Sequence, residues 1–209
     1  MNKVVKKINN QTLIFDYRKF IFWVEESIIL LSDLHIGKVS HFNKNGIFVP
    51  QDVSFENLKI LKSGIQDYGP KEIVFLGDLF HSSYNHEWEE WLDFFNNSKL
   101  TFTLILGNHD KINFKIENLN IFKNLIKGPF YFSHIPSTKR STFNICGHIH
   151  PAFKIRGKAR QSIKLPCYYL SLNQLILPSF GQFTGSHIID FKSTKDEILV
   201  VSKNQIFKV

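Results

Sequence analysis

The fold is decided by Ser27–His35, whose sequence is SIILLSDLH. Its four successive aliphatic residues predict a buried strand over Ser27–Ser32, because a strand covered on both faces is apolar throughout. Similar strands are predicted at Glu72–Leu76 and Thr101–Leu106, and the apolar residues in the segments between the strands have the spacing of helices. Strands that alternate with helices favour a sheet whose parallel strands end at one common edge.

Two helices are predicted in this first half of the chain. One runs from Gln51 to about Asp67 and stops at Gly69-Pro70, and its apolar stripe is Phe55, Leu58, Leu61 and Ile65. The other is capped by Asn85 and ends at Phe95, with the inward stripe Trp88, Trp91, Leu92 and Phe95. Both stripes are typical of helices that cover a sheet.

The rest of the chain is predicted to form short β-strands. A hairpin is predicted at Thr12–Phe15 and Lys19–Trp23. The later strands are Phe130–Ser133, Phe143–Cys146, Pro166–Leu172, Leu175–Leu177, His187–Phe191, Glu197–Ser202 and Gln205–Val209. We therefore expect an α/β (α+β) fold with two stacked, mostly mixed β-sheets flanked by helices. With 209 residues, no repeat and no long linker, a single domain over residues 1–209 is expected.

The composition excludes several classes of protein. Hydrophobic residues make up 43% and charged residues 21%, which fits neither a disordered chain nor a membrane bundle. Ile28–Leu31 is far shorter than the roughly 20 residues that span a bilayer, and Met1–Gln11 lacks the apolar core of a secretory signal. We expect a cytoplasmic protein with no membrane partner, in which Cys146 and Cys167 are buried free thiols.

Polar side chains with metal-ligand chemistry follow five of the predicted strands, and three of these groups begin with glycine. They are Asp33 and His35, Gly77-Asp78, Gly107-Asn108-His109-Asp110, His134, and Gly147-His148 with His150. Carboxylate, imidazole and amide donors without thiolate suit two hard-to-borderline divalent cations. Asp78 is the natural bridging carboxylate, and a hydroxide shared by two cations is a nucleophile for phosphoryl transfer. His109, oriented by Asp110, is expected to assist the leaving oxygen as a non-ligand imidazole.

In this order the motifs resemble those of the calcineurin-like metallophosphoesterases. The resemblance implies an αββα sandwich and two metal ions, with Mn²⁺ as the first choice and Zn²⁺, Fe²⁺ and Mg²⁺ as alternatives. It further implies that one ion is held by Asp33, His35, Asp78 and His150, and the other by Asp78, Asn108, His134 and His148. It makes His109 the transition-state histidine, with Asp110 as its partner.

The flanking sequence is similar to that of the DNA-ligase-associated members of this superfamily. The shared text includes Asp33–Lys38, Gly77–Ser82, Gly147–Pro151, Leu177–Gly181 and Phe183-Thr184-Gly185, with departures at Asn43 and Ser186. This similarity implies a phosphodiesterase or nuclease that acts on DNA in repair, alongside a ligase and a helicase. A phosphatase or small-molecule phosphoesterase and a non-catalytic scaffold are the alternatives; the complete ligand set argues against the scaffold.

The net charge of +8 is confined to one segment. No acidic residue occurs between Glu117 and Asp190, whereas nine lysines and arginines do. Five of them, Lys154, Arg156, Lys158, Arg160 and Lys164, follow the His148/His150 motif, where they are expected to line the metal site and attract a polyanion. A solvated basic hairpin is the alternative interpretation. Arg160 is the first candidate for phosphate binding, because guanidinium binds phosphate bidentately, and Lys38 and His81 are weaker candidates.

Overall fold

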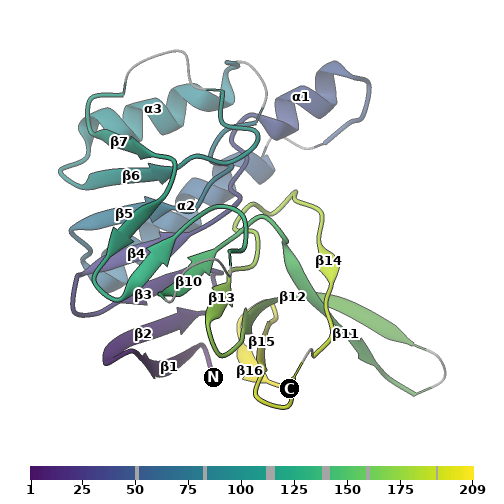
Figure 1. Cartoon of the computed structure of the whole chain (residues 1–209). Helices are drawn as coiled ribbons and strands as arrows, with labels where there is room; N and C mark the ends of the chain where they lie inside the picture. The colour runs from purple at the N-terminus through teal and green to yellow at the C-terminus, as the bar shows by residue number, and fades with distance from the viewer. Residues whose placement is uncertain (50–51, 82–83, 112–115, 138–141, 159–160, 192) are drawn as a thin grey trace.

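The computed structural model describes residues 1–49, 52–81, 84–111, 116–137, 142–158, 161–191 and 193–209, with the main chain alone at 52–54. Within these residues two β-sheets pack face to face (Figure 1). The first sheet has the order β1-β2-β3-β4-β5-β6-β7. Its strands are β1 Lys3–Ile8, β2 Gln11–Asp16, β3 Ile21–Trp23, β4 Ile28–Leu31, β5 Glu72–Phe75, β6 Thr101–Ile105 and β7 Leu119–Phe122.

The register of the first sheet brings three strand ends level with one another. β4, β5, β6 and β7 run parallel, with Leu31 opposite Phe75 and Phe75 opposite Leu104. β1 to β4 are antiparallel neighbours and form a meander that includes the expected hairpin. The loops after β4, β5 and β6 therefore leave from the same edge.

The second sheet supplies two more strand ends to that edge. Its order is β14-β11-β12-β13-β10-β9-β8, and β15 adds to β12 and carries β16. Its strands are β8 Leu125–Lys127, β9 Phe130–Phe132, β10 Phe143–Cys146, β11 Pro151–Arg156, β12 Ser162–Leu170, β13 Gln174–Ile176, β14 His187–Ile188, β15 Glu197–Val201 and β16 Ile206–Lys208. β9 and β10 are parallel, so the loops that follow them also emerge side by side.

Alternate side chains of the buried strands point to two different cores. In β4, Ile28 and Leu30 belong to the core between the sheets, whereas Ile29 and Leu31 face the helices. The second sheet contributes Phe130, Ile145 and other residues to the inter-sheet core. A smaller cluster on its other face contains Cys146 and Cys167, which are buried and free as expected.

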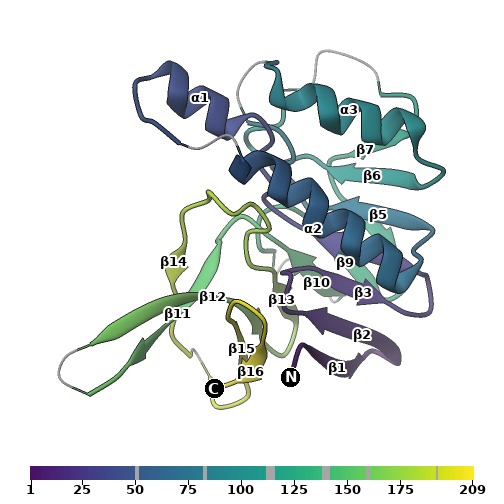
Figure 2. The same ribbon diagram turned by 180° about the vertical axis from the view of Figure 1, so that it is seen from behind.

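Helices α2 (Asp52–Tyr68) and α3 (Glu87–Asn97) cover the outer face of the first sheet, whereas the short α1 (Lys38–Lys44) lies beyond the edge of the sheet (Figure 2). Leu58 and Leu61 of α2 and Trp88, Trp91 and Phe95 of α3 are buried in the core behind this sheet, which confirms most of the two predicted stripes. Phe55 differs, because it is 44% exposed. Gln51, the expected first residue of α2, lies outside the described residues.

Several elements were not predicted from the sequence. β1, β7 and β8 have no fully buried residue, and their sequences, KVVKKI, LNIF and LIK, show no strict apolar–polar alternation over four or more residues. The N-terminus of the short α1 is capped by a residue of another helix. Glu87, the first residue of α3, accepts hydrogen bonds from the N–H groups of Gly37 and Ser40. No helix among the described residues has the length and apolar character needed to cross a bilayer.

Tyr168 of β12 links the two sheets. Its ring is fully buried, and its hydroxyl lies 2.8 Å from the carbonyl oxygens of both Asp16 and Phe20, at the β2–β3 turn. Tyr168→Phe should lower the free energy of unfolding by about 1–2 kcal/mol, the contribution of a buried hydrogen bond. Urea unfolding measures this loss, and Tyr84→Phe, at a ring that is 54% exposed, is the control with little change. Equal losses in the two variants would contradict the role of the Tyr168 hydroxyl.

Candidate metal centre

Five loops, one after each of β4, β5, β6, β9 and β10, carry the predicted ligand residues to one edge of the two sheets (Figure 1). Five of these residues have left-handed main-chain conformations, namely Asp33 (φ 55°), His35 (φ 54°), Asp78 (φ 51°), His148 (φ 69°) and His150 (φ 51°). Such conformations cost of order 1–3 kcal/mol each in a residue other than glycine, and they gather at functional sites. The loops are therefore held in place by contacts that outweigh this strain.

Asp33, His35 and His150 form the first group of potential ligands. Their donor atoms all lie within 4.8 Å of one another, and Nε2 of His150 is 3.0 Å from Oδ1 of Asp33. Nδ1 of His150 lies 3.1 Å from the carbonyl oxygen of Gly185. Because a carbonyl can only accept, Nδ1 of His150 donates to Gly185, and this contact directs Nε2 toward Asp33.

Asp78, His134 and His148 form the second group, also within 4.8 Å of one another. Nε2 of His134 is 3.4 Å from Oδ2 of Asp78 and 3.1 Å from Nδ1 of His148. Nδ1 of His134 donates to the carbonyl oxygen of Leu76 at 2.9 Å. A main-chain carbonyl thus orients this imidazole as well, an arrangement typical of metal-ligating histidines.

Main-chain hydrogen bonds join the two groups and the loops around them. The N–H of His148, in the second group, donates to Oδ2 of Asp33, in the first, at 3.0 Å. The N–H of His109 donates to Oδ1 of Asp78 at 2.9 Å. The two potential metal sites are therefore parts of one connected structure.

Three glycines make room for these contacts. A Cβ atom on Gly77 would collide with the His134 ring, and one on Gly107 would collide with the Asp78 carboxylate. A Cβ atom on Gly147 would collide with Ser32 and Asp33. Glycine at these positions is required for close approach.

The residues fit divalent cations. Both ring nitrogens of His35 are buried without a hydrogen-bond partner among the described residues, a costly arrangement for a polar group that binds nothing. Burial lowers the pKa of His35 to about 3, so the ring is neutral and able to ligate at physiological pH. Two carboxylates and four imidazoles form a donor set suited to first-row divalent metals.

Electrostatics favour an ionised Asp78. Burial raises the pKa of this carboxyl group, but the contact with His134, the His109 N–H and the nearby imidazoles lower it, and the net pKa lies below the ordinary value. Burial lowers the pKa of His134, yet Asp78 more than offsets this, and the net pKa is raised. A cation bound at this group would compete with protonation of His134, so its affinity should fall as the pH falls.

Asp110 binds the main chain of the surrounding loops. Its two carboxylate oxygens accept the N–H groups of Asp78 (2.8 Å), Phe80 (2.9 Å) and Gly107 (2.8 Å). Burial raises its pKa despite these donors. The sequence predicted Asp110 as the partner of the His109 imidazole, whereas its hydrogen bonds to described residues all join main-chain groups of the β5 and β6 loops.

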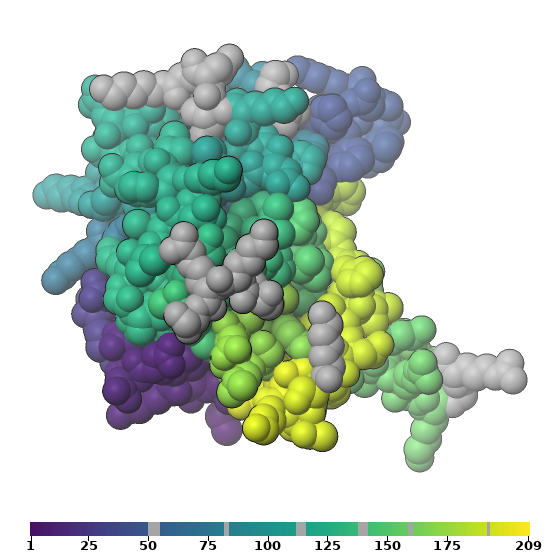
Figure 3. All heavy atoms as spheres, in the orientation of Figure 1, coloured from purple at the N-terminus to yellow at the C-terminus, as the bar shows by residue number. Residues whose placement is uncertain are grey.

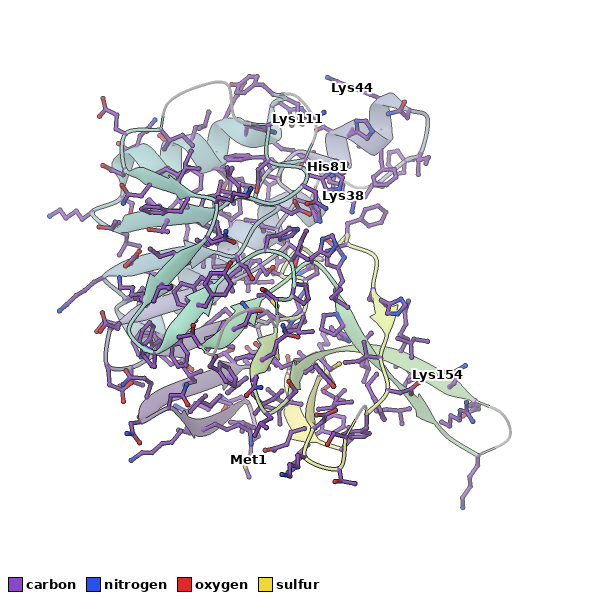
Figure 4. The ribbon with its side chains drawn as sticks, in the orientation of Figure 1. Met1, Lys38, Lys44, His81, Lys111 and Lys154 are labelled. Carbon is purple, nitrogen blue, oxygen red and sulfur yellow. The ribbon has the colours of Figure 1, made fainter. Side chains whose placement is uncertain are left out.

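The remaining candidates lie at the mouth of the site. His109 and Asn108 are exposed, and the His109 ring centroid is 5.5 Å from that of His35 and 4.9 Å from that of His81. Figure 4 shows Lys38 and His81 close together beneath α1. Burial lowers the pKa of Lys38, and the negative charges of Asp78 and Asp33 only partly offset this effect. Burial lowers the pKa of His81 to about 4.

The basic run is placed differently from the expected wall of the metal site. β11 and β12 form a hairpin that projects from the body, and Lys154 lies far out on it (Figure 4). Arg160, the first candidate for phosphate binding, lies outside the described residues. Among the described residues, Lys38 is a cation next to the ligand groups. From the sequence, it was a weaker candidate for phosphate binding than Arg160.

Fold and ligand geometry together define a metal-dependent phosphoesterase. Residues 27–179 match the family model described as Calcineurin-like phosphoesterase, and the chain belongs to this family. The structure resembles the crystal structure of the nuclease MPE from Pseudomonas putida, with a TM-score of 0.84 and 22% identity over 100% of both chains. A predicted phosphoesterase from Streptococcus pneumoniae aligns at a TM-score of 0.32 and 12% identity, over 84% of this chain and 82% of that one. No curated protein matches the chain significantly.

Sequence reasoning missed the groups that support the ligands. Ser32 donates to the Asp33 carboxylate, and its place directly before the ligand was an available signal. The carbonyls of Leu76 and Gly185 orient His134 and His150, but a main-chain acceptor has no signature in the sequence. The cap that Glu87 places on α1 was equally hidden, because it joins segments 50 residues apart.

Asp110→Asn should distinguish two roles of Asp110: binding the main-chain N–H groups of Asp78, Phe80 and Gly107, and the predicted partnership with the His109 ring. An amide presents an NH₂ group to one of the three N–H donors, so the free energy of unfolding should fall by about 1–3 kcal/mol. Metal content, measured by elemental analysis, should fall with it. A shifted pH profile of turnover at unchanged stability would instead favour a partnership with the His109 ring.

Proposed function

We propose that this protein is a dinuclear-metal phosphodiesterase that cleaves DNA. The observation that carries the proposal is the pair of adjacent ligand groups, each with one ionisable carboxylate, joined through His148 and Asp33. Asp33, His35 and His150 would hold one ion, and Asp78, His134 and His148 the other. Asp78 as a bridge and Asn108 as a further ligand complete the proposed set.

Two bound divalent ions would lower the pKa of a water molecule and neutralise the charge of a phosphoryl group. The chain's own residues supply the rest of the chemistry. His109 stands at the mouth, where its imidazole can donate a proton to the leaving oxygen. Lys38 places a cation beside the carboxylates and is proposed to bind a non-bridging phosphate oxygen, with His81 next to it.

The finer assignments rest on the flanking sequence. We propose Mn²⁺ as the native metal because of the resemblance of the sequence to the family; the donor set itself, four imidazoles and two carboxylates, also suits Zn²⁺ and Fe²⁺. We also propose a role in DNA repair in the cytoplasm beside a ligase and a helicase. The nuclease named for the Pseudomonas putida structure is in keeping with a DNA substrate, although 22% identity supports a shared fold alone.

Metal removal tests the proposal directly. Exhaustively chelated protein should hydrolyse neither a bis-aryl phosphodiester nor DNA, and Mn²⁺ should restore both activities, because the nucleophile depends on the ions. Turnover of the two substrates, of a phosphomonoester and of nucleotides is measured across a metal titration. Undiminished activity after chelation would overturn the dinuclear mechanism, and restored hydrolysis of the monoester or nucleotides alone would favour the phosphatase alternative.

His109→Ala should separate catalysis from metal binding. Turnover should fall by roughly 10²–10⁴-fold, the usual contribution of a general acid, while metal content stays at the wild-type level. His187→Ala is the control, since His187 is exposed on β14 and has no proposed part in the reaction. Loss of metal from the His109 variant would identify this residue as a ligand instead.

A further inference from the structure

The β11–β12 arm, residues 153–158 and 161–165, stands apart from the body (Figures 1 and 3). Among the described residues, β14 pairs with β11 only at Pro151 and Ala152, and β15 joins β12 only from Cys167 onward. Beyond those points the two strands pair only with each other. Phe153, Ile155 and Leu165, on the inner side of the arm, pack against the small cluster that contains Cys146 and Cys167. The opposite side of the arm is exposed and belongs to no core, so its residues need another explanation.

One face of the arm is cationic. The register places Lys154 directly opposite Lys164, and Arg156 opposite Ser162. Because side chains two apart in a strand share a face, these four side chains lie on the same side, and all four are exposed. The other side is apolar and includes Ile163, which is 54% exposed.

Positive charge on this face is not balanced within the chain. Like charges directly opposite each other destabilise a two-stranded ribbon. No acidic side chain of the described residues forms an ion pair with Lys154, Arg156 or Lys164, although Nζ of Lys164 donates to the carbonyl oxygen of Ser186 at 3.1 Å. No acidic residue occurs at all between Glu117 and Asp190.

Protection of an exposed strand edge does not account for this pattern. A charge of either sign, or a proline, keeps edges from pairing with other chains. A ribbon built only for that purpose has no need of an opposed lysine pair, and opposite charges would stabilise it. The selective use of cations indicates an external anion with several charges.

The arm and the candidate metal centre are continuous. β11 begins at Pro151, directly after the potential ligand His150. At about 3.3 Å per residue, Lys154 lies roughly 13 Å along the strand from His150, and Arg156 roughly 20 Å. The spacing between these two cations is about 6.6 Å along the strand, which is comparable to the spacing of successive phosphates along a nucleic acid strand.

We propose that the β11–β12 arm binds the sugar–phosphate backbone of a nucleic acid at a distance from the cleaved bond, through Lys154, Arg156 and Lys164. This inference rests on the proposed nuclease function and adds a specificity determinant to it. Contacts far from the metals are available only to a polymer, so the arm favours long substrates over small diesters. Its cations supply affinity without reading bases, because phosphate contacts carry no sequence information.

The test is the triple variant Lys154→Gln, Arg156→Gln and Lys164→Gln. Its kcat/KM for a single-stranded oligonucleotide long enough to span the arm should fall about tenfold at moderate salt. The slope of log affinity against log salt should decrease in magnitude by about 2, at roughly 0.7 for each lost contact to a single strand. Hydrolysis of a bis-aryl phosphodiester should stay at the wild-type rate.

The matched control is Lys3→Gln, Lys7→Gln and Lys71→Gln, which removes the same charge from exposed lysines of β1 and of the loop before β5. It should keep most of the oligonucleotide activity. Because Lys164 also contacts Ser186, the double variant Lys154→Gln and Arg156→Gln is measured beside the triple. An intermediate loss at unchanged thermal stability supports direct contact with the substrate.

Three outcomes would overturn the arm proposal. The first is equal oligonucleotide activity in the arm and control variants, and the second is an equal loss for the oligonucleotide and the bis-aryl diester. The third is loss of binding to anionic phospholipid vesicles with unchanged oligonucleotide affinity, which would assign the arm to a membrane surface. Failure of the proposed function would look different, because the wild-type protein would then cleave neither the oligonucleotide nor the bis-aryl diester. In that case, fluorescence anisotropy with the metal-free protein would still measure whether the arm binds the oligonucleotide.

Discussion

The structure depends most on the hydrogen bond between the His148 N–H and the Asp33 carboxylate. Asp33 is fully buried, and a buried carboxylate is very costly unless hydrogen bonds compensate it. Ser32 supplies one donor from the first sheet, and His148 supplies another from the second. Gly147 lets the two loops approach, since any side chain there would collide with Ser32 and Asp33. The contact between the two sheets at this edge and the arrangement of the two ligand groups thus depend on the same residues.

The parts of the fold that sequence predicted well are those whose signal is local. The apolar run before Asp33 predicts β4, and the spacing of Trp88, Trp91 and Phe95 predicts the buried face of α3, because each pattern reflects burial of the segment itself. α1 has no such pattern. Its N-terminus is satisfied by Glu87, which belongs to another helix, and a cap supplied from a distant segment cannot be read from the residues that it caps.

The candidate site divides in the same way. Its potential ligands could be found from residue type and position, since each follows a strand and the strands end level. The groups that orient these ligands could not be found from the sequence. They are main-chain carbonyls, which bind His134 and His150, and every residue has a carbonyl. Asp110 has a role that its position beside His109 did not indicate, because its carboxylate accepts hydrogen bonds from three main-chain N–H groups. The partnership between Asp110 and the His109 ring stays a prediction.

The distribution of charge ties the arm to the same edge. The site presents two carboxylates, and divalent ions are needed before an anionic substrate can approach them closely. Cations on a projecting ribbon avoid a conflict that cations inside the site would create, since ammonium groups next to the imidazoles would compete with metal ions by repulsion. Lys38 is the exception, and its lowered pKa reflects the cost of placing a lysine there. Separating metal binding from polyanion attraction along β11 lets both act on one phosphate chain, with His150 directly before the strand and Arg156 at its far end.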